Sequence, residues 1–273
     1  MPELAEVETL MRYMQHHVTG EKIISFSQRR QNLRYMLDCD LKNHALGQII
    51  DVKRVAKFLV IELDNSNSLI FHLGMSGRLT LQSQDYALQK HDHIIIGFKS
   101  GSQLVFNDAR RFGMVYSCKT DQLYAQKFLK SMGQEPLLEE FNTNYLTKNL
   151  ASKKSPIKTA IMDNRIVVGV GNIYAAESLF AAKIHPEKPA NQLSVLEITA
   201  LIDSIKSVLE QAIRAGGTTL KDFVSGDSKP GYFKQELNVY DREGKPCYIC
   251  KNPIVKIKQA GRSTFFCLNC QKS

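Results

Sequence analysis

The sequence predicts an α+β protein in which a strand-rich N-terminal half precedes a helical region and a small metal-binding module. Three observations support this fold class. Short apolar runs separated by polar turns fill residues 22–118, helical periodicity dominates residues 142–215, and two Cys-x2-Cys pairs stand near the C-terminus. Short strands at such spacing are typical of a sandwich or a barrel.

A helix is expected within residues 1–18, almost directly after Pro2 and Glu3. Four apolar residues there follow the period of an amphipathic helix: Val7, Leu10, Met11 and Met14. Pro2 is therefore expected close to a packed helix, within the folded body.

The strand region contains two expected hairpins. Residues 57–63 and 68–73 flank the polar turn Asp64-Asn-Ser-Asn67, and residues 93–98 and 103–106 flank Lys99-Ser-Gly-Ser102. Turn residues between apolar runs of this length are typical of antiparallel pairs.

The clearest helix begins at Ser194, where Glu197 completes a capping box, and ends at Gly216-Gly217. Its expected apolar face comprises Ile198, Leu201, Ile202, Ile205, Val208, Leu209, Ala212 and Ile213. Residues 217–235 show little periodicity and are expected to form a loop.

The net charge is +9, and it is unevenly distributed. Residues 229–273 carry nine lysines and arginines against three acids, a net charge of +6. A basic terminal module favours a polyanionic partner, most simply nucleic acid; the alternative is a solvated basic face.

No apolar run has the length of a membrane span and no signal region is visible, so a cytoplasmic protein is expected.

Four cysteines predict one structural zinc ion. Cys247 and Cys250 form one pair, Cys267 and Cys270 the other, with sixteen residues between the pairs. Two such pairs supply the tetrahedral thiolates that zinc prefers. Disulfides are the alternative, but cytosolic thiols stay reduced. Cys39 and Cys118 are interpreted as inert packing residues.

Pro2 and Glu3 are the first candidates for catalysis. If Met1 is removed, the chain begins with a secondary amine whose pKa lies far below that of lysine, so part of it is neutral and nucleophilic at pH 7. Glu3 and Glu6 could transfer protons nearby. Alternatively, both carboxylates cap the helix, where its dipole favours them, and for Glu6 this interpretation is preferred.

Further segments indicate contacts with phosphate or bases. Gly169-Val-Gly171-Asn172 places Asn172 at a helix N-terminus, where free N–H groups bind phosphate, although the motif also serves as an ordinary turn. Residues 251–262 are basic without an acid and are expected to form the zinc hairpin, with an arginine at its tip. Phe112 beside Arg110 and Arg111 suits wedging into a base stack, but spacing alone favours a buried strand aromatic.

Together these residues give the chain a resemblance to bacterial formamidopyrimidine-DNA glycosylases. The similarity runs nearly from end to end through MPELAEVET, the Lys57 region, HLGMSGRL, KHDH, DARRFG, MDNRIVVGVGNIYAAESLF, GGTTLKDF, PGYFKQELNVY and the cysteine finger with GRSTFFC. Ala5 and Ala109 depart from the family, which usually has proline at both positions. These changes soften local rigidity without removing a functional group.

The resemblance implies a β-sandwich domain over residues 1–132, a helix-two-turn-helix domain with a base-capture loop over 133–235, and a zinc finger over 236–273. It implies a monomeric bifunctional enzyme without a membrane or an obligate protein partner. This enzyme excises oxidised purines, namely 8-oxoguanine and formamidopyrimidines, from double-stranded DNA and cleaves the backbone by β,δ-elimination.

The resemblance also implies roles for individual residues. Pro2 is the nucleophile, Glu3 the proton donor, Lys57 a phosphate contact that assists elimination, and Arg262 the δ-elimination residue. DNA-binding residues are His91, Arg110, Lys153, Asn172 and Arg262. Met75, Arg110 and Phe112 fill the void left by the flipped base, and a loop around Thr218–Asp227 covers that base.

Two other functions remain open from the sequence. An enzyme of the endonuclease VIII type has the same fold and nucleophile but prefers oxidised pyrimidines. The start MPEL-x-EVET and the full-length loop after Gly217 favour the purine enzyme. A non-catalytic protein that binds damaged DNA would need the finger, Asn172 and Phe112, but not Pro2, Glu3 or Lys57.

Overall fold

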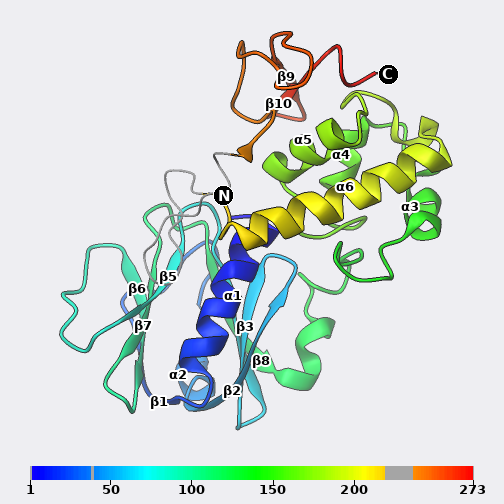
Figure 1. Cartoon of the computed structure of the whole chain (residues 1–273). Helices are drawn as coiled ribbons and strands as arrows, with labels where there is room; N and C mark the ends of the chain where they lie inside the picture. The colour runs from blue at the N-terminus through cyan, green and yellow to red at the C-terminus, as the bar shows by residue number, and fades with distance from the viewer. Residues whose placement is uncertain (1, 38–39, 219–235, 273) are drawn as a thin grey trace. The chain divides into compact units, whose positions relative to one another are not determined.

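The computed structural model describes residues 2–37, 40–218 and 236–272 (Figure 1). The chain divides into two compact units, which are Met1–Lys130 with Ala215–Lys234, and Ser131–Arg214 with Gln235–Ser273. The three-part division at residues 132 and 235 stays a prediction. Within the described ranges, no helix has the length and apolar character needed to cross a membrane.

Unit 1 is built from antiparallel strands and one long helix. Its elements are α1 (Leu4–Val18), β1 (Lys22–Gln28), α2 (Leu41–His44), β2 (Gly47–Val55), β3 (Phe58–Leu63), β4 (Asn67–His72), β5 (Arg78–Gln82), β6 (Asp92–Phe98), β7 (Gln103–Asn107), β8 (Met114–Lys119) and the 3-10 helix η1 (Thr120–Ala125). Both expected hairpins are confirmed, because β3 pairs with β4 and β6 pairs with β7.

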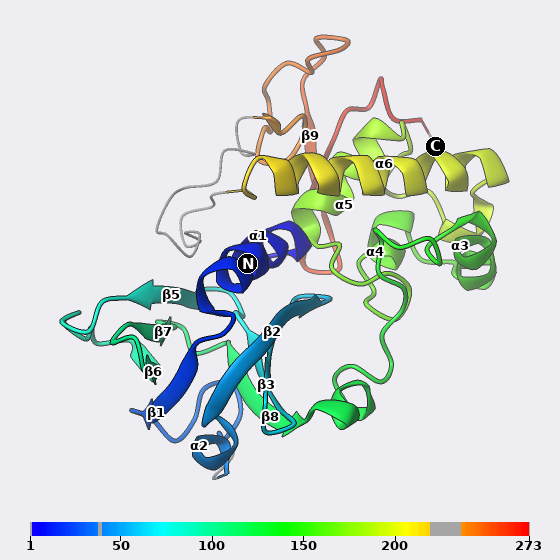
Figure 2. The ribbon, with the colours of Figure 1, turned by 60° about the horizontal axis from the view of Figure 1, so that its bottom comes forward.

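The strands form the expected sandwich. Their order is β5-β7-β6-β1-β2-β3-β4-β8, but β1 and β2 share only the pairs Lys22–Gln48 and Ile23–Gly47. The sheet therefore turns a corner there, and Figure 2 shows β5, β7, β6 and β1 on one side and β2, β3 and β8 on the other. One core contains side chains of both halves, such as Ile96 and Phe106 with Ile61 and Phe71.

Helix α1 closes one side of this core, as its period predicts. Val7, Leu10 and Met14 are buried in the sandwich core, and Met11 packs partly buried against it. The helix contacts β2 and β3. At its start the Glu3 N–H donates to Oε2 of Glu6 at 2.8 Å, so Glu6 caps the helix as expected.

Unit 2 contains the helices and the cysteine module. Its elements are α3 (Thr143–Leu150), α4 (Ile157–Ile161), α5 (Asn172–Ala181), the 3-10 helix η2 (Ala190–Gln192), α6 (Val195–Arg214), β9 (Val255–Gln259) and β10 (Arg262–Phe266). The α6 prediction is confirmed in detail. Ser194 and Glu197 exchange hydrogen bonds, and the buried side chains of α6 are the eight of the expected face. Because α5 contacts both α6 and β10, it connects the bundle to the hairpin.

Candidate functional site

The N-terminus of α1 holds Pro2 and Glu3 in buried positions, with 3% of Glu3 exposed. Glu6 anchors this end of the helix in two directions. Its Oε2 accepts from the Glu3 backbone, and its Oε1 accepts from both the backbone N–H and the hydroxyl of Thr218, each at 2.8 Å. Gly217 adopts a φ of +82°, and a β-carbon there would lie 3.1 Å from Oε1 of Glu6.

This link between Glu6 and Thr218 was not predicted from the sequence. It joins residues 212 positions apart, which no local period reveals. It fixes Thr218, the first residue of the expected base-capture loop, against the helix that begins two residues after Pro2. The rest of that loop, up to Asp227, lies outside the described residues.

Lys57 lies near His72, a histidine that no sequence pattern singled out. Lys57 follows Ala56 in the turn between β2 and β3. The next residue, Phe58, is paired with His72 across the sheet. Burial, together with the charges of Lys57 and Arg34, lowers the pKa of His72 to about 4. The Gly74 N–H donates to Nδ1 of His72 at 3.0 Å, so the neutral ring carries its proton on Nε2.

The three residues expected to fill a base void line one pocket. Met75, Arg110 and Phe112 surround a volume of about 590 Å³ together with His72 and Arg34. The Arg110 guanidinium lies 4.9 Å from the centroid of the Phe112 ring. A cation over an aromatic face is attracted by the ring quadrupole.

The structure corrects the interpretation of Phe112 as a buried strand aromatic. Its side chain is 42% exposed and lies in the loop between β7 and β8. Arg110 and Phe112 are therefore neighbours in a loop and not alternate residues of one strand. Arg111 between them adopts a φ of +56°, a left-handed conformation that ends the extended backbone.

The backbone of His91 is bonded to Asp108, which precedes the Arg110–Phe112 loop. Its carbonyl accepts from the Asp108 N–H at 3.0 Å, and its ring lies 6.2 Å from that of His93. Burial lowers the pKa of His93, whose Nε2 donates to the Asp108 carbonyl at 2.9 Å.

In unit 2 a second pocket, of about 440 Å³, is strongly basic. Lys153, Lys158, Arg165 and Arg262 contribute to its lining, and Asp163 is the one acid among its lining residues. A bidentate contact from Arg165 lowers the pKa of Asp163 and keeps it ionised. The surplus of fixed cations suits a polyanion.

Arg262 occupies the tip of the β9–β10 hairpin, as expected. It pairs with Gln259 across a two-residue turn, and both turn residues, Ala260 and Gly261, have positive φ. Such turns match the twist of the flanking strands. The Arg262 side chain is exposed.

Asn172 is the first residue of α5, so its predicted place at a helix N-terminus is confirmed. Its Oδ1 accepts from Nζ of Lys158 at 2.5 Å, and its Nδ2 donates to the Ser263 carbonyl at 2.9 Å. Lys158 is only 1% exposed and also donates to Thr264 at 2.8 Å. Asn172 is thereby fixed to the hairpin.

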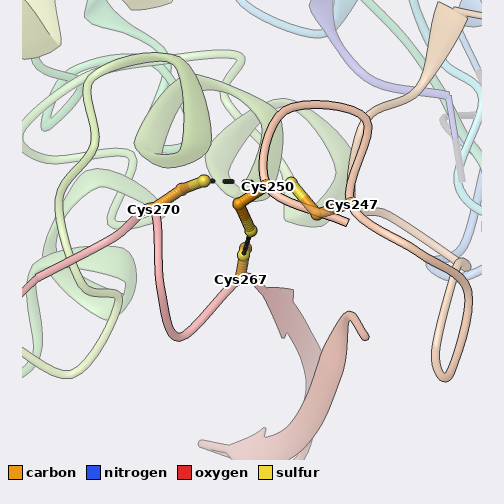
Figure 3. Close-up of side chains that lie close together, drawn as sticks. All are labelled: Cys247, Cys250, Cys267 and Cys270. Atoms are coloured by element: carbon orange, nitrogen blue, oxygen red, sulfur yellow. Dashed lines mark hydrogen bonds between the residues drawn. The ribbon is translucent and has the colours of Figure 1, made fainter. Parts of the chain in front are cut away.

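The four cysteine sulfurs converge on one point (Figure 3). All lie within 4.8 Å of one another, with Cys247 and Cys270 at 3.9 Å and Cys250 and Cys267 at 3.4 Å. A tetrahedral zinc site with Zn–S bonds of about 2.3 Å requires S···S separations of about 3.8 Å. The donors therefore fit one structural zinc ion. The described cysteines form no disulfide.

Three family models match consecutive parts of the chain. Residues 1–115 match the formamidopyrimidine-DNA glycosylase N-terminal domain, and residues 132–224 match the formamidopyrimidine-DNA glycosylase H2TH domain. Residues 244–272 match a zinc finger found in FPG and IleRS.

Relatives and solved structures match over the whole length. A formamidopyrimidine-DNA glycosylase of Rickettsia conorii is 54% identical, and one of Rickettsia bellii is 52% identical, each with full coverage of both chains. A Lactococcus lactis FPG mutant in complex with Fapy-dG DNA is 37% identical with a TM-score of 0.93 and full coverage of both chains. A MutM structure with DNA containing carbocyclic 8-oxo-G is 38% identical, with a TM-score of 0.91 and the same coverage.

Proposed function

The chain belongs to the formamidopyrimidine-DNA glycosylase family, and on this premise we propose that it is a bifunctional base-excision repair enzyme. Its substrate is double-stranded DNA containing oxidised purines, namely 8-oxoguanine and formamidopyrimidines. The observation that supports the proposal is the buried start of α1, where Glu6 binds the backbone of Glu3, next to Pro2, and also binds Thr218.

Pro2 is the proposed nucleophile after removal of Met1. Its secondary amine attacks C1′ of the damaged nucleotide, the glycosidic bond breaks, and the base leaves while Glu3 donates a proton. After the nitrogen loses its proton, its lone pair expels O4′ from C1′, and O4′ takes up a proton as the sugar ring opens. The product is an iminium ion that acts as an electron sink. Removal of the C2′ proton then expels the 3′ phosphate, and a second elimination expels the 5′ phosphate. A one-nucleotide gap with phosphate at both ends remains.

Lys57 and Arg262 are proposed to assist these eliminations, Lys57 as a phosphate contact and Arg262 in the δ-step. His91, Lys153, Asn172, Arg110 and Arg262 are proposed to hold DNA. The basic pocket that contains Lys153 and Arg262 supports this assignment, because phosphate contacts from lysine and arginine position a duplex without reading its sequence.

Met75, Arg110 and Phe112 are proposed to occupy the gap left by the extruded nucleotide. Extrusion costs a few kcal/mol of stacking and pairing, and a side chain in the gap offsets part of this cost. The shared pocket of the three residues supports this role. The zinc ion on Cys247, Cys250, Cys267 and Cys270 fixes the hairpin that presents Arg262.

The enzyme is further proposed to act as a monomer on bacterial DNA, and therefore in the cytoplasm, without an obligate protein partner. Size-exclusion chromatography with light scattering tests the monomer. A dimer at micromolar concentration would contradict it.

Borohydride trapping on an 8-oxoguanine duplex tests the reaction, because borohydride reduces an iminium ion to a stable crosslink. Peptide mapping should place the adduct on Pro2. A variant with Pro2→Gly keeps a primary amine and should retain partial activity, whereas a chain that retains Met1 should be inactive. An adduct on Lys57 would overturn the nucleophile, and absence of trapping would favour a non-catalytic DNA-binding protein.

A panel of defined lesions tests the substrate class. One similar structure, a Lactococcus lactis FPG of 37% identity and TM-score 0.91, contains DNA with an oxidised pyrimidine, so the panel must include such lesions. Faster excision of oxidised pyrimidines than of 8-oxoguanine and formamidopyrimidines would favour the endonuclease VIII type.

A further inference from the structure

Asp108 at the end of β7 is fully buried, with 0% exposed, and its two carboxylate oxygens bind two different loops. Oδ1 accepts from the Ser76 hydroxyl at 2.6 Å, and Oδ2 accepts from the Gly113 N–H at 2.7 Å. Ser76 follows Met75 in the chain, and Gly113 follows Phe112. One carboxylate thus connects the backbone beside Met75 to the backbone beside Phe112.

Ser76 extends this connection to Arg110. While its hydroxyl donates to Asp108, its oxygen accepts from the Arg110 N–H at 3.0 Å. A hydroxyl group can fill both roles at once. Each of Met75, Arg110 and Phe112 therefore either lies next to a residue bound to Asp108 or is bound through Ser76.

The two loops are also in direct backbone contact. Gly74 has a φ of +62°, and a β-carbon there would collide with the backbone carbonyl of Phe112. A β-carbon at Gly113 would lie 2.9 Å from Oδ2 of Asp108. The Met75 loop is itself closed by the Gly77 N–H, which donates to the Leu73 carbonyl at 2.8 Å. The two loops are therefore packed backbone to backbone, and moving them apart would break the hydrogen bonds to Asp108.

We propose that Asp108 is a positioning residue that locks the Met75 loop to the Arg110–Phe112 loop, so that the three side chains enter a duplex as one preformed wedge. Asp108 itself touches neither DNA nor the reacting atoms. Fixing the loops beforehand removes the entropy cost of ordering them during base extrusion. This inference rests on the proposed function, because it assigns the wedge to the extrusion step.

The first measurement is amide hydrogen exchange in the free protein. In Asp108→Ala both acceptor oxygens are lost, so the Ser76 hydroxyl and the Gly113 N–H each lose their partner and the two loops are no longer joined through residue 108. Protection of the Gly113 and Arg110 amides should fall at least tenfold. Ser76→Ala should lower protection of the Arg110 amide. Ser68→Ala is the matched control, because it removes a hydroxyl bonded to Thr120 at 2.9 Å on the far strand pair of the same unit.

The second measurement is the ratio of two single-turnover rates, excision from an 8-oxoguanine duplex and elimination at a preformed abasic site. The abasic site has no base to unstack, so its extrusion depends less on the wedge. Asp108→Ala and Ser76→Ala should lower the ratio at least tenfold. Ser68→Ala should leave the ratio unchanged, even where its melting temperature falls as far as that of Ser76→Ala.

The outcomes separate this inference from the proposed function. Unchanged protection of Gly113 and Arg110 in Asp108→Ala would show that Asp108 does not join the loops. Lost protection with an unchanged rate ratio would show that the junction is merely structural. A wild-type chain that excises no lesion would overturn the proposed function and with it the positioning role, while hydrogen exchange would still report whether the loops are locked.

Discussion

Lys158 places its ammonium nitrogen 2.5 Å from Oδ1 of Asn172, although the lysine side chain is almost completely buried. The same nitrogen donates to Thr264 and to the Ser263 carbonyl on β10. A buried cation thus connects the first residue of α5 to the hairpin that carries Arg262. The position of one proposed phosphate contact relative to another depends on this lysine.

Lys158→Met should loosen this connection. The methionine fills similar space but leaves the oxygens of Asn172 and Thr264 without their donor, which costs about 1–3 kcal/mol for each buried acceptor. The melting temperature should fall, and affinity for damaged and undamaged duplexes should fall together. Fluorescence anisotropy and a thermal melt measure both. Lys148→Met on the exposed face of α3 is the control for loss of one charge, and equal effects of the two variants would contradict the prediction.

Phe112→Ala should lower excision without large loss of stability. Because the ring is 42% exposed, the change in unfolding free energy should stay below about 1 kcal/mol, whereas a buried phenylalanine costs about 3–5 kcal/mol. Met75→Ala should behave alike, and both should keep elimination at a preformed abasic site. A large drop in melting temperature with loss of both activities would show that Phe112 serves the core.

His72 should make stability depend on pH in the acid range. Its pKa is about 4 in the folded protein, against the ordinary value of 6.5 for histidine, so the unfolded chain binds the proton more strongly. The neutral ring therefore makes its full contribution to the free energy of unfolding above about pH 6.5. This contribution decreases as the pH falls towards 4, by about 3 kcal/mol in total. Denaturant titrations of His72→Gln should show a flatter decrease than wild type. The exposed His17→Gln variant is the control, and parallel curves for wild type and His72→Gln would refute the assignment.

Removal of zinc should release the hairpin from α5. Elemental analysis should find one zinc per chain, and Cys267→Ser should lose it together with DNA binding, because the ion orders a module whose small core is completed by Ala176 and Phe180 of α5. The sandwich of unit 1 should remain folded. Cys118→Ser, in a buried cysteine outside the cluster, should retain the metal. Active protein without stoichiometric zinc would show that the metal is not needed to order the module or to bind DNA.

Lys153→Ala should lower the salt dependence of DNA binding. Each phosphate contact contributes about 0.9 to the slope of log affinity against log salt concentration, so the slope should decrease by roughly one. Damaged and undamaged duplexes should be affected alike. Lys148→Ala serves as the matched control. If both variants keep the wild-type slope, Lys153 is a solvated lysine.

The sequence alone determined what depends on local order along the chain. The face of α6 and the hairpins follow from periods of 3.6 and 2, which reflect backbone geometry alone. The zinc ligands follow from two short spacings, because each Cys-x2-Cys pair forms half a tetrahedral site by itself. The place of Asn172 at a helix start follows from the glycines before it.

Tertiary structure decided which distant groups meet. Spacing favoured a buried Phe112, but the left-handed Arg111 turns the chain out of the strand and exposes the ring. His72, Lys158 and Asp108 look ordinary in the sequence, and their importance comes from partners on other elements. The contact of Glu6 with Thr218 spans nearly the whole chain. Such contacts have no period, because they depend on how separate elements pack, and a buried polar group must find its partner wherever packing places one.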